Sequence, residues 1–347
     1  MDALSPRVPH IGRLPAGPRD SIADVAGVTV GHCTLDEGPV QTGVTVVSPH
    51  GGNLFTHKLP AAVAVINGFG KSAGLIQIDE LGTLETPIAL TNTFAVGAVL
   101  TAQIRHALRA NPESGRSLPT VNAVVMECND GYLNDQQAFA IQDSHFRQAL
   151  DALSAEVEQG AVGAGRGMSS FGLKGGIGTA SRRAVVGSTH TGFTVGALVL
   201  SNFGRLPELI IDGHPLGREL AAADAPENAP EKGSIIMILA TDAPLDARQL
   251  KRLATRAGAG LARTGSAYGH GSGDIALAFS TAQQIEADAE CVQMALLADH
   301  VLDPLFHAAV DSVEQAIVNA LFAARTVHGR DGHIRTSLRD RLAALRA

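Results

Sequence analysis

Gly233 and Ser234 stand between a polar segment and an apolar one in the stretch ENAPEKGSIIMILATDAPL, residues 227–245. A serine hydroxyl becomes a nucleophile when a neighbouring base takes its proton. If the 233–234 peptide bond were broken, the α-amine of Ser234, with an ordinary pKa of about 7.7–8.0, would be such a base on the same residue. Gly233 favours cleavage because glycine lacks Cβ, which leaves its carbonyl accessible and permits a strained backbone. Taken alone, the pair equally fits an ordinary turn that enters a strand.

A second candidate pair lies in the stretch YGHGSGDIALAFS, where Ser272 and Asp274 are two residues apart. Side chains two apart on a strand project from one face, so this hydroxyl and carboxylate could together orient a serine at the start of a neighbouring strand. The alternative is a Gly-Ser-Gly-Asp turn with no role in chemistry.

The elements that would carry these residues are short apolar runs bounded by turn residues, such as AAVAVINGFG, NAVVMECNDG, GALVLSNFG and SIIMILATD. Such runs predict buried strands and at least one sheet covered on both faces. Apolar spacing predicts a helix through Leu250–Leu261 that starts near Asp242 and Pro244, and a longer helix over 292–325 interrupted at Pro304. The pattern indicates a layered α/β or α+β fold, with residues 221–233 as a surface linker.

Composition excludes several classes of function. The 347 residues carry a formal net charge of −7, which gives no basic face for nucleic acid. There are three cysteines without a CxxC pair and no HExxH motif, so neither a disulfide framework nor a metal site is predicted. The glycine-rich stretch 160–178 contains no phosphate-binding motif and is interpreted as a connection that lines a pocket. No GxSxG elbow, secretory signal or membrane span is found, so a cytoplasmic protein is expected.

These motifs, taken in order, resemble one family. The chain is similar to the self-processing serine aminopeptidases, which include the L-aminopeptidase/D-amidase/esterase and the β-peptidyl aminopeptidases. The resemblance covers nearly the whole sequence and rests on DVAGVTVGHCT, INGFGKSAGLIQIDELGTLETPIALTNT, ECNDGYLND, GLKGGIGTASRR, SNFG, GSIIMILATDAPL and GSGDIALAFST.

The resemblance implies a single αββα domain of four layers over 1–347, similar to the amino-terminal-nucleophile hydrolases but with different connectivity. It implies self-cleavage before Ser234 into an α chain, 1–233, and a β chain, 234–347. Ser234 would be the nucleophile, supported by Ser272 and Asp274, and Asn202 in SNFG would stabilise the oxyanion.

In the stretch ECND, Glu127 would bind the ammonium group of the substrate. Asn129 stands where some members have a tyrosine, and the nearby Tyr132 belongs to the DGYLND part of the motif. Substrate preference among L-, D- and β-aminoacyl groups therefore stays open.

The resulting hypothesis is an aminopeptidase that releases small amino-terminal residues from short peptides, amides or esters through an acyl-enzyme. It would act without a cofactor, as a homo-oligomer such as a tetramer. One alternative is an acyltransferase of the ornithine acetyltransferase type, although that class uses threonine where this chain has Ser234. The other is an unprocessed binding protein on the same fold.

Overall fold

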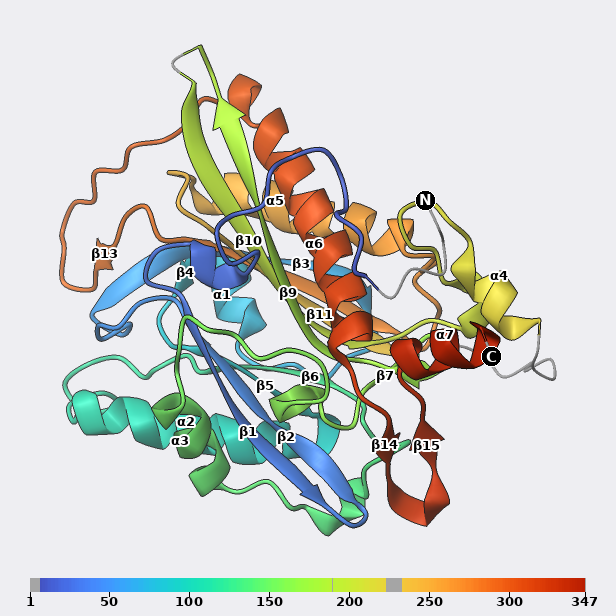
Figure 1. Ribbon diagram of the computed structural model, residues 1–347. Coiled ribbons are helices and arrows are strands. Elements are labelled where there is room, and N and C mark those ends of the chain that lie inside the picture. Colours follow the sequence, from blue (N-terminus) through green and yellow to red (C-terminus); the bar gives the residue numbers. More distant parts are fainter. Residues whose placement is uncertain (1–6, 189, 223–232, 347) are drawn as a thin grey trace.

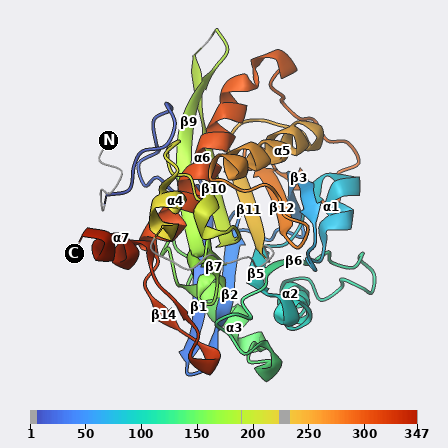
Figure 2. The same cartoon turned by 90° about the vertical axis from the view of Figure 1, so that its right-hand side faces the viewer.

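The computed structural model describes residues 7–188, 190–222 and 233–346, which fold into four layers (Figures 1 and 2). Two sheets lie face to face, and helices cover the outer face of each. The predicted α+β fold with an αββα sandwich is confirmed. The predicted surface linker, 221–233, falls mostly on residues 223–232, which lie outside the described residues.

The larger sheet has the strand order β13–β3–β12–β11–β10–β9, with β4 beside β3. Its strands are β3 His57–Gly68, β4 Thr83–Leu84, β9 Gly176–Val186, β10 Thr191–Asn202, β11 Ser234–Thr241, β12 Gly273–Ser280 and β13 Ile285–Glu286. The smaller sheet has the order β1–β2–β5–β6, with β1 Thr29–Glu37, β2 Val40–Ser48, β5 Ile88–Asn92 and β6 Val124–Cys128.

The remaining elements are helices and two short strand pairs. The helices are α1 Leu75–Leu81, α2 Val96–Ala110, α3 Asp143–Asp151, α4 Leu216–Ala221, α5 Ala247–Arg263, α6 Asp303–Ala323 and α7 Leu338–Arg346. The strand pairs are β7 Ser169–Ser170 with β8 Leu173–Lys174, and β14 Val327–His328 with β15 Ile334–Arg335. α5 and α6 cover the larger sheet, while α2 and α3 cover the smaller one.

Strand β11 shows why an unbroken apolar run forms a strand here. Ile235, Met237 and Leu239 belong to the core between the larger sheet and its helices. Ile236 and Ile238 alternate with them and belong to the core between the two sheets. Because both faces of β11 are covered, every position along the run is buried, as the sequence predicted.

Two helix boundaries differ from the predicted ones. Helix α5 begins at Ala247 rather than near Asp242, because Asp246 and Gln249 form a capping box in which Asp246 Oδ1 accepts the Gln249 N–H at 2.7 Å. Pro304 lies in the first turn of α6, where a missing N–H costs nothing, so it starts this helix instead of interrupting it. Residues 292–298 form no helix.

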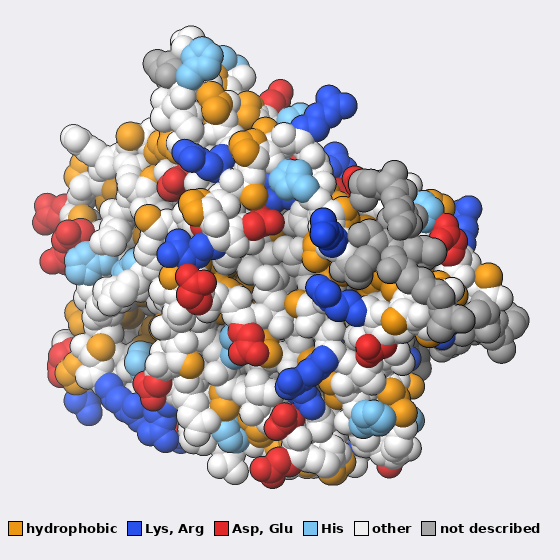
Figure 3. Space-filling model, viewed as in Figure 1, with side chains coloured by type: hydrophobic (Ala, Val, Ile, Leu, Met, Phe, Trp, Pro, Cys, Tyr) orange, Lys and Arg blue, Asp and Glu red, His pale blue; other side chains and the backbone are white. Residues whose placement is uncertain are grey.

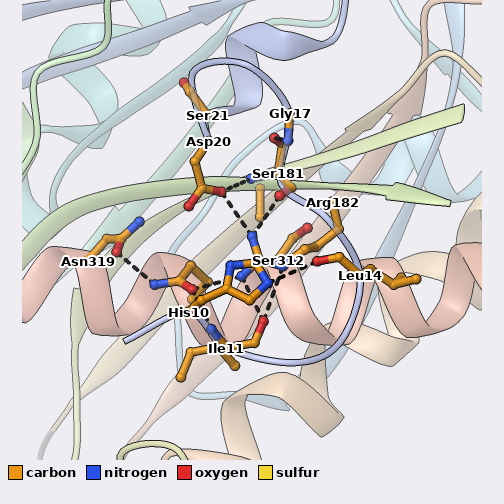
Figure 4. A network of polar contacts seen from close by, with 12 residues as sticks. His10, Ile11, Leu14, Gly17, Asp20, Ser21, Ser181, Arg182, Ser312 and Asn319 are labelled. Carbon is orange, nitrogen blue, oxygen red and sulfur yellow. Dashed lines mark hydrogen bonds and ion pairs between the residues drawn. The ribbon is translucent and has the colours of Figure 1, made fainter. Parts of the chain in front are cut away.

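The amino-terminal segment, residues 7–24, runs over β9 and α6 and is fixed by a buried arginine (Figure 4). The Arg182 side chain is fully buried on β9, and its guanidinium donates to Ile11 O at 2.8 Å and to Gln315 Oε1 at 2.7 Å. It also pairs with Asp20 at 2.9 Å. These hydrogen bonds satisfy a charge that would otherwise be costly to bury, so the segment is an integral part of this layer.

Ser181 offers a test of that attachment. Its hydroxyl accepts the Gly17 N–H at 3.0 Å and donates to Asp24 at 2.7 Å. Ser181→Ala leaves a buried N–H without its acceptor, so we expect a loss of about 1–2 kcal/mol in unfolding free energy. Trypsin should then cut faster after Arg13, which is exposed on this segment.

The matched control is Ser312→Ala. Ser312 is buried in the same layer, but its hydroxyl donates to Val195 O of β10 at 2.9 Å. Equal trypsin sensitivity of the two variants would contradict the proposed fixing of residues 7–24.

The surface and the helices carry few other signals. Basic and acidic side chains are interspersed over the face shown in Figure 3, so on that described face opposite charges offset one another. None of the described helices combines the length and the apolar character that crossing a bilayer requires.

Candidate active site

Ser234 is the first residue of β11, a central strand of the larger sheet. Its neighbours in register are Asn202, the last residue of β10, and Gly273, the first residue of β12. β11 and β12 are parallel, so their starts lie at one edge of the sheet, as the sequence predicted for Ser234 and the Ser272–Asp274 pair. The structure therefore brings three candidate segments together around Ser234.

The Gly233–Ser234 peptide is tightly enclosed. A Cβ on Gly233 would lie 2.7 Å from Asn202 O and 2.7 Å from Phe203 Cα, so only glycine fits against the end of β10. Gly233 does not adopt a left-handed backbone. The requirement for glycine is therefore close packing and not the backbone strain that the sequence suggested.

The Ser234 hydroxyl faces its own upstream carbonyl. Ser234 Oγ donates to Gly233 O at 2.6 Å, and both residues are buried. The Gly273 N–H lies 3.3 Å from Gly233 O and 3.3 Å from Ser234 Oγ. One backbone donor thus serves both the nucleophile candidate and the carbonyl that it would attack.

Ser272 and Asp274 interact as their spacing predicted. Ser272 Oγ donates to Asp274 Oδ1 at 2.6 Å, and both side chains are fully buried. A bulge separates Asp274 from Ile275 where β12 pairs with β3. Bulges change the direction in which a strand presents its side chains, so this one sets the orientation of the pair beside Gly273.

Asn202 is held by both ends of its amide. Its Oδ1 accepts the Ser169 N–H at 2.8 Å, and its Nδ2 donates to the Asn129 carbonyl at 2.9 Å. The side chain of Asn129 is directed elsewhere, because its Oδ1 accepts from Gly131 N and Gln136 Nε2. Asn129 therefore contacts Asn202 through its backbone.

Tyr132 belongs to a different contact. Its ring stacks on His333 at 4.5 Å between centroids, and the Arg335 guanidinium lies 3.6 Å from the ring centroid. The side chain of Tyr132 thus packs against the β14–β15 pair, and not against Asn202.

Glu127 reaches this region from β6 of the other sheet. Its Oε1 accepts the Lys71 N–H at 2.8 Å, and its Oε2 accepts the Thr93 hydroxyl. A Cβ on Gly70 would lie 3.7 Å from Glu127 Oε1 and 3.9 Å from Gly273 Cα. The backbone at Gly70 therefore lies beside both the Glu127 carboxylate and the start of β12.

The pKa of the buried Cys128 thiol is affected by the carboxylates of the site. Burial raises its pKa well above the ordinary value, and the carboxylates of Glu127 and Asp274 raise it further. A thiol in this environment stays protonated at neutral pH, so Cys128 is not itself a candidate nucleophile. Within the described residues, no three His, Cys, Asp or Glu side chains gather in a way that could hold a metal ion.

Three groups that hydrogen-bond to the candidate residues were not predicted from the sequence. They are the Gly273 N–H, the Lys71 N–H and the Thr93 hydroxyl. Gly273 lies inside the motif that revealed Ser272 and Asp274, so its strand-start position was a usable signal. Thr93 follows β5 and offers no such signal, because its role depends on the pairing of β5 with β6.

The chain is similar in sequence and in fold to known peptidases. Residues 20–335 match peptidase family S58. The β-peptidyl aminopeptidase BapA of Sphingosinicella microcystinivorans is 39% identical over an alignment of 351 positions, and the alignment spans 94% of this chain and 86% of that protein. The β-aminopeptidase of a Burkholderia species superposes with a TM-score of 0.88 at 41% identity, over 97% of this chain and 96% of that one.

A third relative defines the fold. The L-aminopeptidase D-Ala-esterase/amidase of Ochrobactrum anthropi, described as a new variant of the Ntn hydrolase fold, superposes with a TM-score of 0.89 at 36% identity. The superposition covers 97% of this chain and 96% of the Ochrobactrum chain. Fold and sequence together define a hydrolase of the aminopeptidase class. The chain belongs to peptidase family S58.

Proposed function

We propose that this protein cuts its own chain before Ser234 and then acts as an aminopeptidase through the new amino terminus. The products would be an α chain, 1–233, and a β chain, 234–347. The observation that supports this most directly is the hydrogen bond of 2.6 Å from Ser234 Oγ to Gly233 O, inside a peptide whose glycine admits no side chain.

In the first reaction, Ser234 Oγ attacks the Gly233 carbonyl carbon. Oγ loses its proton, the C–N bond breaks, the nitrogen of Ser234 takes up that proton, and an ester joins Gly233 to the serine oxygen. The Gly273 N–H, 3.3 Å from Gly233 O, is placed to stabilise the negative charge that develops there. Water then hydrolyses the ester, leaving a carboxylate on Gly233 and a free α-amine on Ser234.

In the second reaction, the α-amine of Ser234 accepts the proton of its own hydroxyl as Oγ attacks the substrate carbonyl. The leaving amine takes a proton, and water hydrolyses the resulting acyl-enzyme. Asn202 would donate to the oxyanion, since its Nδ2 carries two hydrogens and one is engaged by the Asn129 carbonyl. The Ser272–Asp274 pair would fix the position of the amine.

The Glu127 carboxylate would select substrates with a free amino terminus. Two donors, Thr93 Oγ1 and the Lys71 N–H, hold it in place. Its charge suits a substrate ammonium group, which accounts for release of one terminal residue and not for internal cleavage. Small L-, D- or β-aminoacyl groups in peptides, amides or esters are the proposed substrate class.

The experiment is mass spectrometry of the purified wild-type protein followed by substrate assays. We expect two fragments, the second beginning with SIIMIL, and turnover of β-alanyl or L-alanyl p-nitroanilide but not of their N-acetylated forms. An intact chain without activity would favour the binding-protein alternative. Turnover only of acetylornithine with glutamate would favour the acyltransferase.

A further inference from the structure

Residues 69–71 form a wall that runs from the start of β12 to Glu127. Gly68, the last residue of β3, pairs with Gly273. The backbone that follows Gly68 lies directly against Gly273. A Cβ built on Gly273 would be 2.6 Å from Phe69 O and 3.2 Å from Gly70 Cα. At the other end of the wall, the Lys71 N–H binds Glu127 Oε1. The wall therefore runs from the neighbour of Ser234 to the carboxylate.

The side chain of Lys71 turns back along this wall. Its Nζ lies 4.3 Å from the centroid of the Phe69 ring, and Phe69 is the residue whose carbonyl lies against Gly273. Phe69 is 52% exposed, and the centroid of the His270 ring lies 6.1 Å from that of the Phe69 ring. A cation is thus held by an aromatic face in contact with solvent, where an anionic group could reach it.

We propose that the Lys71 ammonium binds the free carboxylate of the leaving group, so that the enzyme prefers dipeptides with a free carboxyl terminus over the corresponding amides. This inference rests on the proposed function, with the substrate ammonium on Glu127 and its carbonyl at Ser234. A substrate bound in that way directs its leaving group past Gly273, toward the Phe69 end of the wall.

The charges agree with a dipeptide whose two ends are free. The Glu127 carboxylate and the Lys71 ammonium have opposite charges, which match the ammonium and carboxylate ends of such a substrate. A longer peptide would carry its carboxylate beyond Lys71.

The test compares kcat/KM for β-alanyl-L-alanine and for its carboxyl-terminal amide. For a solvent-exposed ion pair we expect the wild-type protein to prefer the acid by about fivefold, with a ratio that falls as salt is raised. Lys71→Met should bring the ratio close to one, Lys71→Glu should invert it, and Lys71→Arg should keep most of it. The control is Lys251→Met, an exposed lysine of α5 paired with Asp79, which should keep the wild-type ratio.

The outcomes separate this inference from the proposed function. If Lys71→Met and Lys71→Glu hydrolyse both substrates with the wild-type ratio, the role of Lys71 is refuted while the aminopeptidase stands. If the wild-type protein hydrolyses neither substrate nor the p-nitroanilides, both proposals fail together.

Discussion

A protein that carries Ser234→Ala is expected to remain one chain of 347 residues and to show no aminopeptidase activity. The substitution removes the oxygen that lies 2.6 Å from Gly233 O, and without cleavage the α-amine proposed as the base never forms. Loss of a nucleophile of this kind lowers kcat by about six orders of magnitude. Intact-mass measurement and a p-nitroanilide assay on the same sample would check both effects.

Ser280→Ala is the matched control for this prediction. Ser280 is also buried, at the opposite end of β12, and its hydroxyl bonds to Ala243 O. This variant should still yield the two fragments. Appearance of a fragment that begins at residue 234 in Ser234→Ala would show that another group cuts the chain, and would refute the role of the serine oxygen.

The sequence could predict the part of the site that follows local rules. A polar segment followed by an unbroken apolar run predicted that a buried strand starts at Ser234, and β11 starts there. Spacing of two residues predicted the common face of Ser272 and Asp274, and the hydrogen bond between them confirms it. Both inferences depend only on how a strand directs its side chains.

Contacts between the two sheets could not be predicted in this way. Glu127 lies on β6, and the groups that hold it come from the segments after β3 and β5. Strand periodicity gives no information about which elements face each other, so the position of Glu127 came from the resemblance alone. The reason for Gly233 was likewise hidden, since it depends on the end of β10.

The helix error has a local cause. Apolar residues at helical spacing before Pro304 predicted one helix from residue 292, yet Val292 and Leu296 are exposed and lie outside α6. Spacing shows that a helix would be amphipathic, but not that another element is present to bury its apolar face.

The second large effect is the dependence of stability on pH, which involves two buried groups whose pKa values are shifted in opposite directions. His32 lies on β1 with Nδ1 2.9 Å from Thr45 Oγ1, and burial lowers its pKa from 6.5 to about 4. Between these values the unfolded chain binds a proton that the folded chain does not. The contribution of neutral His32 to stability is therefore lost as pH falls from about 6.5 to about 4, and it amounts to about 3 kcal/mol.

Asp130 changes in the opposite direction. Burial raises its pKa from 3.8 to about 6, although hydrogen bonds from Thr42, Gln136 and Asn134 favour the ionised form. Here the folded chain binds the proton that the unfolded chain releases. The contribution is fully present below about 3.8 and is lost as pH rises through about 6, again by about 3 kcal/mol.

The two contributions change the unfolding free energy with pH in opposite directions, so they offset each other in the wild-type protein. Single substitutions should separate them. We expect His32→Asn to gain stability relative to its parent as pH falls from 6.5 to 4, and Asp130→Asn to gain it as pH rises from 4 to 6. Urea unfolding in a Ser234→Ala background would measure both on an uncleaved chain, which keeps the transition free of fragment dissociation. Each variant is the control for the other, because a general effect of acid on the fold would move both in the same direction. If the stability difference between variant and parent changed with pH in the same direction for both variants, the assignment of these two groups would be contradicted. Changes in opposite directions would identify His32 as the side chain that makes the fold sensitive to acid, and Asp130 as the one that compensates for it.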